Sequence, residues 1–207
     1  MAPSDSVIAG QYRRIVDATA TVLSRKGYDR ATVRQIIAVA GVSRRTFYDL
    51  FSGIEDVFYV AHTKALDTLG ERVNVACGEE REWLRGVAVA IAMAIDWAAT
   101  DPPNAQLVAA HPFVAGPFAG RCHDLLVARF APGLAEGRLV AGIQLSLSQE
   151  EALLAGAAAV IARHVSLGLT SSGVLAAELT QLVLTPYVGS VEARRISRAG
   201  DEGGRRG

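Results

Sequence analysis

The stretch TVRQIIAVAGVSRRTFYDLF, residues Thr32–Phe51, predicts two short helices joined by a tight turn. Thr32 and Gln35 match the T-x-x-Q capping box of a helix start. Gly41 can end the first helix because glycine adopts a positive φ at little steric cost, and Ser43 is a favourable N-cap for the second helix. Apolar side chains recur with helical spacing on one face of each helix: Val33, Ile36, Ile37 and Ala40, then Phe47, Leu50 and Phe51. The pattern indicates a helix-turn-helix.

The other face of the second helix is polar and carries two arginines, Arg44 and Arg45, at its start. Cations are disfavoured at the positive end of a helix dipole, so this placement makes more sense beside phosphates than as an ordinary solvated helix start. An arginine there can donate two hydrogen bonds to guanine, which discriminates against a wrong base by about 1–3 kcal/mol. Helix–glycine–helix corners also occur in proteins that bind no nucleic acid, so the flanking sequence decides.

The flanking sequence extends the pattern over residues 13–58, RRIVDATATVLSRKGYDRATVRQIIAVAGVSRRTFYDLFSGIEDVF. This run resembles the DNA-binding domain of TetR-family transcriptional regulators. The resemblance implies a first helix, from about Gln11 to Lys26, that braces the corner, a third helix that reads DNA, and a homodimer that binds a partly palindromic duplex. It implies phosphate contacts by Thr32 and Tyr48. The DNA-binding residues that we predict are Thr32, Arg34, Ser43, Arg44, Arg45, Thr46 and Tyr48.

Ile54 departs from the family pattern, because it lies where the family usually has a lysine that holds a phosphate. Its absence is expected to reduce the salt dependence of DNA binding by roughly one unit of slope per missing contact. The helix that follows, Gly53–Cys77, is still predicted, with Ser52 and Glu55 as an S-x-x-E capping box. This departure leaves an alternative open, in which a dimeric small-molecule or protein binder has kept the fold and lost DNA binding.

Charge supports DNA binding only locally. The 207-residue chain has 21 basic and 21 acidic residues and no net charge, so it has no global attraction to nucleic acid. Residues 1–50, in contrast, hold eight Lys or Arg against four Asp, a surplus of four. A homodimer would present this surplus at two half-sites.

Composition predicts an all-helical chain, since half of the residues are hydrophobic and alternating strand patterns are hard to find. We expect a helix-turn-helix domain over residues 1–56, a helical effector-binding and dimerisation domain over 57–189, and a disordered tail over 190–207. Pro132–Gly133 is expected to end a helix, and residues 137–147 to be mostly coil. There is no secretory signal, no uninterrupted apolar run of membrane length and no paired cysteine pattern, which favours the cytoplasm.

The final two predicted helices, residues 149–168 and Leu175–Pro186, are apolar on most sides and the first is rich in Ala and Gly. Such helices must be covered all round. The family resemblance implies that this pair packs against its copy in a homodimer; the alternative is burial within one subunit.

The resemblance also implies a pocket for a small-molecule effector in the second domain. The candidates in and near the central helices are Trp97, His111, Phe113, Phe118, Cys122 and His123, although each residue taken alone fits ordinary core better. Acidic residues are scarce there, which argues against a strongly cationic ligand and favours an apolar or amphipathic one.

We predict no enzymatic activity, metal or cofactor. Cys122, His123 and Asp124 are neighbours on a helix and so point about 100° apart, which prevents a catalytic relay. The histidines and cysteines lack metal-ligand spacing, and no glycine-rich phosphate loop is present.

Overall fold

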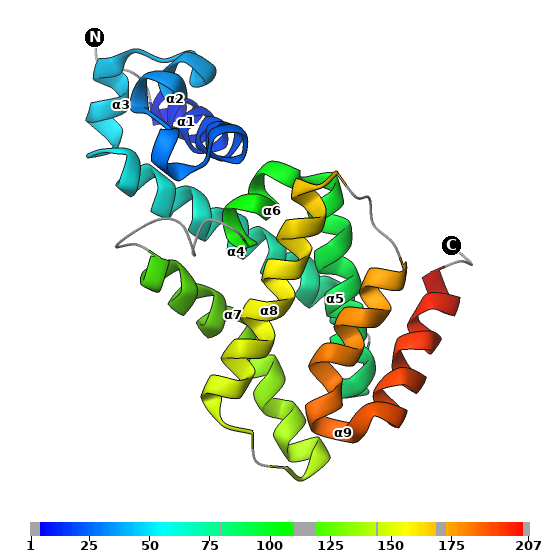
Figure 1. The fold of residues 1–207 in the computed structure, drawn as a ribbon. Coiled ribbons are helices and arrows are strands. Elements are labelled where there is room, and N and C mark those ends of the chain that lie inside the picture. The colour runs from blue at the N-terminus through cyan, green and yellow to red at the C-terminus, as the bar shows by residue number, and fades with distance from the viewer. Residues whose placement is uncertain (1–4, 79, 110–118, 144, 169–172, 205–207) are drawn as a thin grey trace.

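The computed structural model describes residues 5–78, 80–109, 119–143, 145–168 and 173–204. Over these ranges the chain forms α-helices and one short 3-10 helix, with no strand, which confirms the all-helical prediction (Figure 1). The elements are α1 Asp5–Lys26, η1 Tyr28–Arg30, α2 Val33–Ala40, α3 Arg44–Leu50, α4 Ile54–Cys77, α5 Trp83–Thr100, α6 Pro102–Ala109, α7 Ala119–Ala141, α8 Leu147–Ser166 and α9 Gly173–Gly204.

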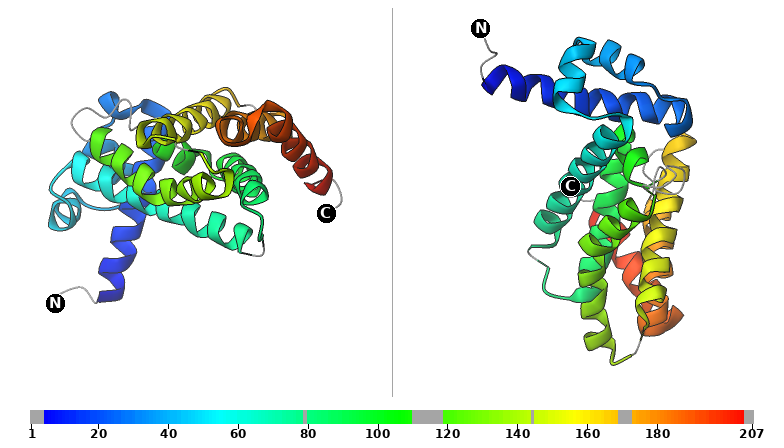
Figure 2. Two further views of the ribbon diagram at one scale, coloured as in Figure 1. Left: turned by 90° about the horizontal axis from the view of Figure 1, so that it is seen from below. Right: turned by 90° about the vertical axis from the view of Figure 1, so that its left-hand side faces the viewer.

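Helices α1–α3 form a small unit at one end of the molecule, and α4 leads from it into the bundle of α5–α9 (Figures 1 and 2). The caps of α2 agree with the sequence prediction. Gln35 N–H donates to Thr32 Oγ1 at 3.3 Å, and Thr32 N–H donates to Gln35 Oε1 at 3.0 Å. Gly41 ends α2 with φ of 63°. The turn is therefore specified by local chemistry.

The cap of α4 differs from the prediction. Asp56, and not Glu55, accepts hydrogen bonds from Ser52, at 2.9 Å from its N–H and 3.2 Å from its hydroxyl. The N-cap of α4 is Gly53, in extended backbone with φ of 174°, so the cap begins one residue later than the S-x-x-E spacing assumes. The predicted Ser52–Glu55 box is wrong for this reason.

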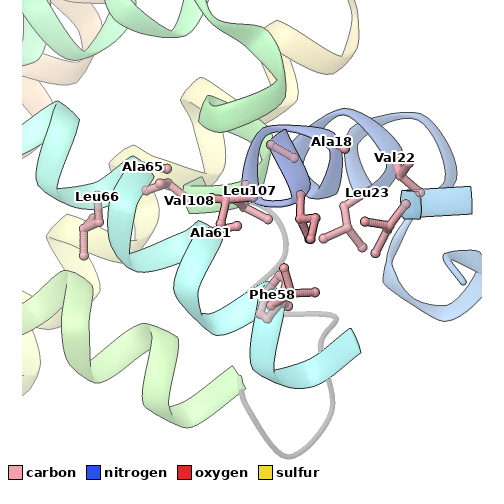
Figure 3. Packing of buried hydrophobic residues seen from close by; sticks show 14 of the residues in the cluster. Ala18, Val22, Leu23, Phe58, Ala61, Ala65, Leu66, Leu107 and Val108 are labelled. Atoms are coloured by element: carbon pink, nitrogen blue, oxygen red, sulfur yellow. The ribbon is translucent and has the colours of Figure 1, made fainter. Parts of the chain in front are cut away.

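One hydrophobic core runs from the helix-turn-helix into the bundle. Phe47 and Ile36 are fully buried in the N-terminal unit, and the same cluster continues through Phe58 of α4 to Leu107 and Val108 of α6. Figure 3 shows Leu23 of α1, Phe58 and these α6 side chains along this path. The N-terminal unit is thus packed onto the bundle and is not joined by a flexible linker.

Helix α7 continues through Pro132, where the sequence predicted a break, and extends to Ala141. Tertiary contacts hold this part of the helix. Trp83 of α5 donates from Nε1 to the carbonyl of Gly133 at 2.7 Å, and Leu134 is 6% exposed. Packing against α5 therefore overrides the local preference of proline.

Helix α9 also extends beyond its predicted end, so residues 190–204 are not a disordered tail. Gly189, with φ of 77°, turns the helix, and a second arm follows that folds back along the first (Figure 1). Ala193 and Ile196 in this arm are buried in a cluster to which α5 contributes Leu84 and Val87. Burial against α5 explains why the arginine-rich tail is helical.

Two helical segments, Trp83–Thr100 and Gly173–Arg198, are long and apolar enough to cross a membrane by length and composition alone. Core helices of water-soluble proteins meet the same criterion, so this is weak support for a membrane span. In this chain α5 and α9 pack against each other through a shared apolar cluster that includes Ile91, Ile95 and Leu179.

Trp83 is the centre of a tightly packed cluster at the end of the bundle far from α1–α3. The centres of the Trp83 and Tyr187 rings lie 4.9 Å apart, and the Tyr187 hydroxyl donates to buried Glu150 at 3.0 Å. Arg138 Nε lies 3.2 Å from the same carboxylate oxygen. Burial, and then the hydrogen bond to Glu150, raises the pKa of Tyr187. The cluster joins α5, α7, α8 and α9.

We expect Gly137→Ala to lower the free energy of unfolding by about 1–3 kcal/mol, the usual range for overpacking a core. A Cβ at this position would overlap the rigid indole of Trp83. Denaturant titration measures the effect. Gly133→Ala, in the same helix, is the matched control, because its Cβ would meet no atom within 4 Å. Equal stability of the two variants would contradict the packing described here.

Candidate nucleic-acid interface and effector site

The polar face of α3 presents the predicted recognition residues to solvent. Ser43 caps the helix and accepts from Thr46 N–H at 3.0 Å, while the two hydroxyl oxygens lie 2.8 Å apart. On the opposite face Phe47 is fully buried and Phe51 is 3% exposed. Because the buried face fixes the rotation of the helix, the polar face is held outward.

Two pairs of residues, each four positions apart, line this outer face. The guanidinium of Arg44 lies 5.6 Å from the centre of the Tyr48 ring, and Arg45 Nε lies 3.9 Å from Asp49 Oδ2. The Arg45 and Asp49 side chains are 91% and 66% exposed, so their ion pair contributes little to stability. Both arginines can therefore move toward a ligand at small cost.

Thr32 and Arg34 lie at the start of α2 and are exposed. The Thr32 oxygen accepts a hydrogen bond from the Gln35 amide, which leaves its own O–H available as a donor. Tyr48 is 47% exposed, and its ring is nearly perpendicular to that of Phe47, with ring centres 5.3 Å apart. Hydroxyl donors of this kind suit phosphate oxygens.

Asp49 also lies on this polar face; it is not among the predicted contact residues, and in the structure it pairs with Arg45. Its spacing of i, i+4 from Arg45 was the available signal. Tyr12 of α1 also stacks on Phe51, with ring centres 5.1 Å apart, and so braces the end of α3 from outside.

The start of α4 differs from the rest of this surface. Ile54 packs against the core, and the first turn of the helix carries Glu55 and Asp56. The first turn of α4 is therefore acidic, whereas the first turn of α3 is basic and carries Arg44 and Arg45.

Residues 15–59 match the family model described as "Bacterial regulatory proteins, tetR family". The N-terminal domain is a TetR-family domain. The matched residues contain α2, α3 and all seven predicted contact positions, in agreement with the resemblance that the sequence carries. No curated protein matches the whole sequence significantly.

Solved structures show that the rest of the chain follows the same TetR-like fold. The chain resembles the fatty acid degradation regulator FadR from Bacillus halodurans, with a TM-score of 0.70 at 18% identity over 84% of this chain and 93% of that one. FadR from Bacillus subtilis, in complex with stearoyl-CoA, gives a TM-score of 0.70 at 19% identity over 86% and 98%. RolR in complex with resorcinol gives a TM-score of 0.60 at 14% identity, over 93% of this chain and 95% of that one.

The predicted effector residues are only partly described. Trp97 of α5 and Cys122 of α7 belong to one buried cluster, at 2% and 0% exposure. His123 is half-buried beside Cys122, and His111, Phe113 and Phe118 lie outside the described residues. Burial raises the pKa of the Cys122 thiol to about 11, so the thiol is protonated at neutral pH. Over the described residues, no group of three or more His, Cys, Asp or Glu could hold a metal ion.

Proposed function

We propose that this TetR-family chain is a sequence-specific DNA-binding regulator that acts as a repressor in the cytoplasm. The observation that carries the proposal is the outer face of α3. Arg44, Arg45 and Tyr48 are exposed on a helix whose cap and buried face fix its orientation. In this proposal α3 enters the major groove, its arginines read base edges, and Thr32, Arg34 and Tyr48 hold phosphates.

The proposed regulator is a homodimer that binds a partly palindromic site through its two α3 helices. The dimer interface that we propose is formed by α8 and α9. Along α8, Ala152 and Ala159 are exposed two helical turns apart, and their small side chains would let a second helix approach closely. Along α9, Val174 and Leu182 are 67% and 45% exposed. Covering these apolar residues in a second copy would remove them from water.

We further propose that a small-molecule effector in the C-terminal domain controls operator affinity. The related folds include one with bound stearoyl-CoA and one with bound resorcinol. The core that runs from Trp97 through Leu107 and Phe58 to α1 supports such coupling, because packed interiors transmit small displacements. Control requires that the effector bind one dimer geometry more tightly than the other. An apolar or amphipathic effector suits the buried cluster.

The competing proposal is a dimeric binder that has lost DNA binding. Ile54, followed by Glu55 and Asp56 at the start of α4, is the observation that favours it, since this helix start offers a phosphate no side-chain cation. The two proposals differ in whether binding to duplex DNA falls with salt, because a DNA-binding protein releases counterions when it contacts phosphates.

We expect Ile54→Lys to strengthen DNA binding and to steepen its dependence on salt by roughly one unit of slope per subunit. Fluorescence anisotropy of a labelled duplex at several salt concentrations measures both quantities. Ile54→Gln is the control, since it replaces the apolar side chain without adding charge. If neither the unsubstituted protein nor Ile54→Lys shows salt-dependent binding, the binder without DNA replaces the regulator.

A further inference from the structure

Trp97 carries a polar group that is buried with no hydrogen-bond partner among the described residues. Its side chain is 2% exposed, and its Nε1 has no hydrogen-bond acceptor within the described ranges of the chain. The other tryptophan provides an internal comparison, because Trp83 donates from Nε1 to Gly133 at 2.7 Å. Buried indole N–H groups usually find a partner, and an unmade hydrogen bond in a protein interior is unfavourable. The described residues around Trp97 therefore offer its N–H no acceptor.

Trp97 packs in a cluster of buried apolar side chains. It belongs to a cluster that also contains Leu107 and Val108 of α6 and Cys122 and Leu126 of α7. An interior lined by apolar side chains with a few directed polar groups is typical of small-molecule sites. The indole N–H can only donate a hydrogen bond, and the protonated Cys122 thiol is a weak donor and a weak acceptor.

The positions of buried carboxylates indicate which charge a ligand beside Trp97 can carry. Glu150 is the buried carboxylate among the described residues, and it belongs to the Trp83 cluster, where Arg138 and Tyr187 contact it. No described carboxylate is buried in the cluster of Trp97. An ammonium group would thus lack a buried counter-charge, whereas an uncharged oxygen acceptor would complete the hydrogen bonding of the indole.

We propose that the Trp97 N–H is the hydrogen-bond donor that orients the effector, and that the effector is an apolar molecule with an uncharged acceptor oxygen such as a ketone or ester carbonyl. This inference rests on the proposed effector control and names the ligand class for it. The acceptor oxygen lies against α5, and the hydrocarbon part lies among the side chains of α6 and α7.

Three probes of similar shape test the ligand class: acetophenone carries a carbonyl, ethylbenzene has no polar group, and 1-phenylethylamine is a cation. Heteronuclear NMR of the indole N–H groups reports directly on Trp97, because the full chain has two tryptophans and Trp83→Phe assigns the other signal. Acetophenone is expected to shift the Trp97 signal downfield and to bind about three- to tenfold more tightly than ethylbenzene, the usual gain from one hydrogen bond. The amine is expected to bind least.

Trp97→Phe should abolish the preference for acetophenone over ethylbenzene while ethylbenzene still binds. Equal affinity for these two probes, an unmoved Trp97 signal, or binding of none of the three would each overturn the proposal. Because the NMR measurement needs no DNA, it tests the ligand site separately from the proposed DNA-binding function. A shifted indole signal with unchanged operator affinity would instead remove effector control and leave the ligand site in place.

Discussion

Arg44→Ala and Arg45→Ala are each expected to weaken binding to a specific operator by about 1–3 kcal/mol, the range for an arginine that reads guanine. Binding to random duplex should fall much less, since non-specific binding depends only on phosphates. The reason is the position of both arginines in the first turn of α3, outside the buried face that Phe47 defines. Anisotropy titrations with a specific and a scrambled duplex measure the two losses.

Two controls separate base reading from charge. Arg85→Ala removes the same charge from an exposed residue of α5 and should leave both affinities unchanged. Tyr48→Phe removes a phosphate donor and should weaken binding to both duplexes alike. Equal losses on the specific and scrambled duplexes for the two α3 arginine variants would refute base reading by these residues.

Phe58→Ala is expected to lower the free energy of unfolding by about 3–5 kcal/mol. Phe58 is fully buried on α4, and its ring meets that of Tyr28 edge-on at 5.2 Å, so it joins the N-terminal unit to the bundle. Denaturant titration at one fixed protein concentration measures the loss, because the stability of the proposed dimer would depend on concentration. Phe58→Leu keeps most of the volume and should lose much less.

The shared core also predicts that the N-terminal unit and the bundle of the Phe58→Ala variant unfold together. Trp83 and Trp97 both report on the bundle, whereas circular dichroism reports on all helices. If one core joins the two parts, the fluorescence and circular dichroism transitions should coincide and shift together. A variant that loses part of its helix signal early, with an unshifted fluorescence transition, would show that the two parts unfold separately.

The sequence predicted the helix-turn-helix well because its signals are local. The Thr32–Gln35 box, Gly41 and the Ser43 cap all lie within three or four residues of the groups that they satisfy. The buried face of α3 also follows from spacing alone, through Phe47. The roles of the exposed residues in contacting DNA remain predictions.

The errors in α7 and α9 arose where distant parts of the chain decide the structure. Helix α7 passes through Pro132 because Trp83, some fifty residues away, bonds to Gly133. Residues 190–204 are helical because Ala193 and Ile196 bury against α5. Neither contact can be read from the local sequence. The local sequence therefore predicted a helix break at the proline and a disordered, charged tail.

The effector residues show the same limit in another form. The sequence suggested Trp97 and Cys122 from their type and neighbourhood, and the structure places both in one buried cluster. The Trp97 indole finds no acceptor in the described part of the chain, whereas the Trp83 indole has one, and this difference depends on the packing of several helices.

Selection of bound duplexes from a random pool by the purified protein, followed by sequencing, tests the central claim most directly. A dimer that presents two α3 helices predicts an inverted repeat, with half-sites separated by about one helical turn, 34–36 Å, or somewhat more. Arg44→Ala should then lose preference at particular base pairs within each half-site. Recovery of no sequence above background by the folded, ligand-free protein would contradict sequence-specific DNA binding and favour a binder of the same fold that has lost DNA binding.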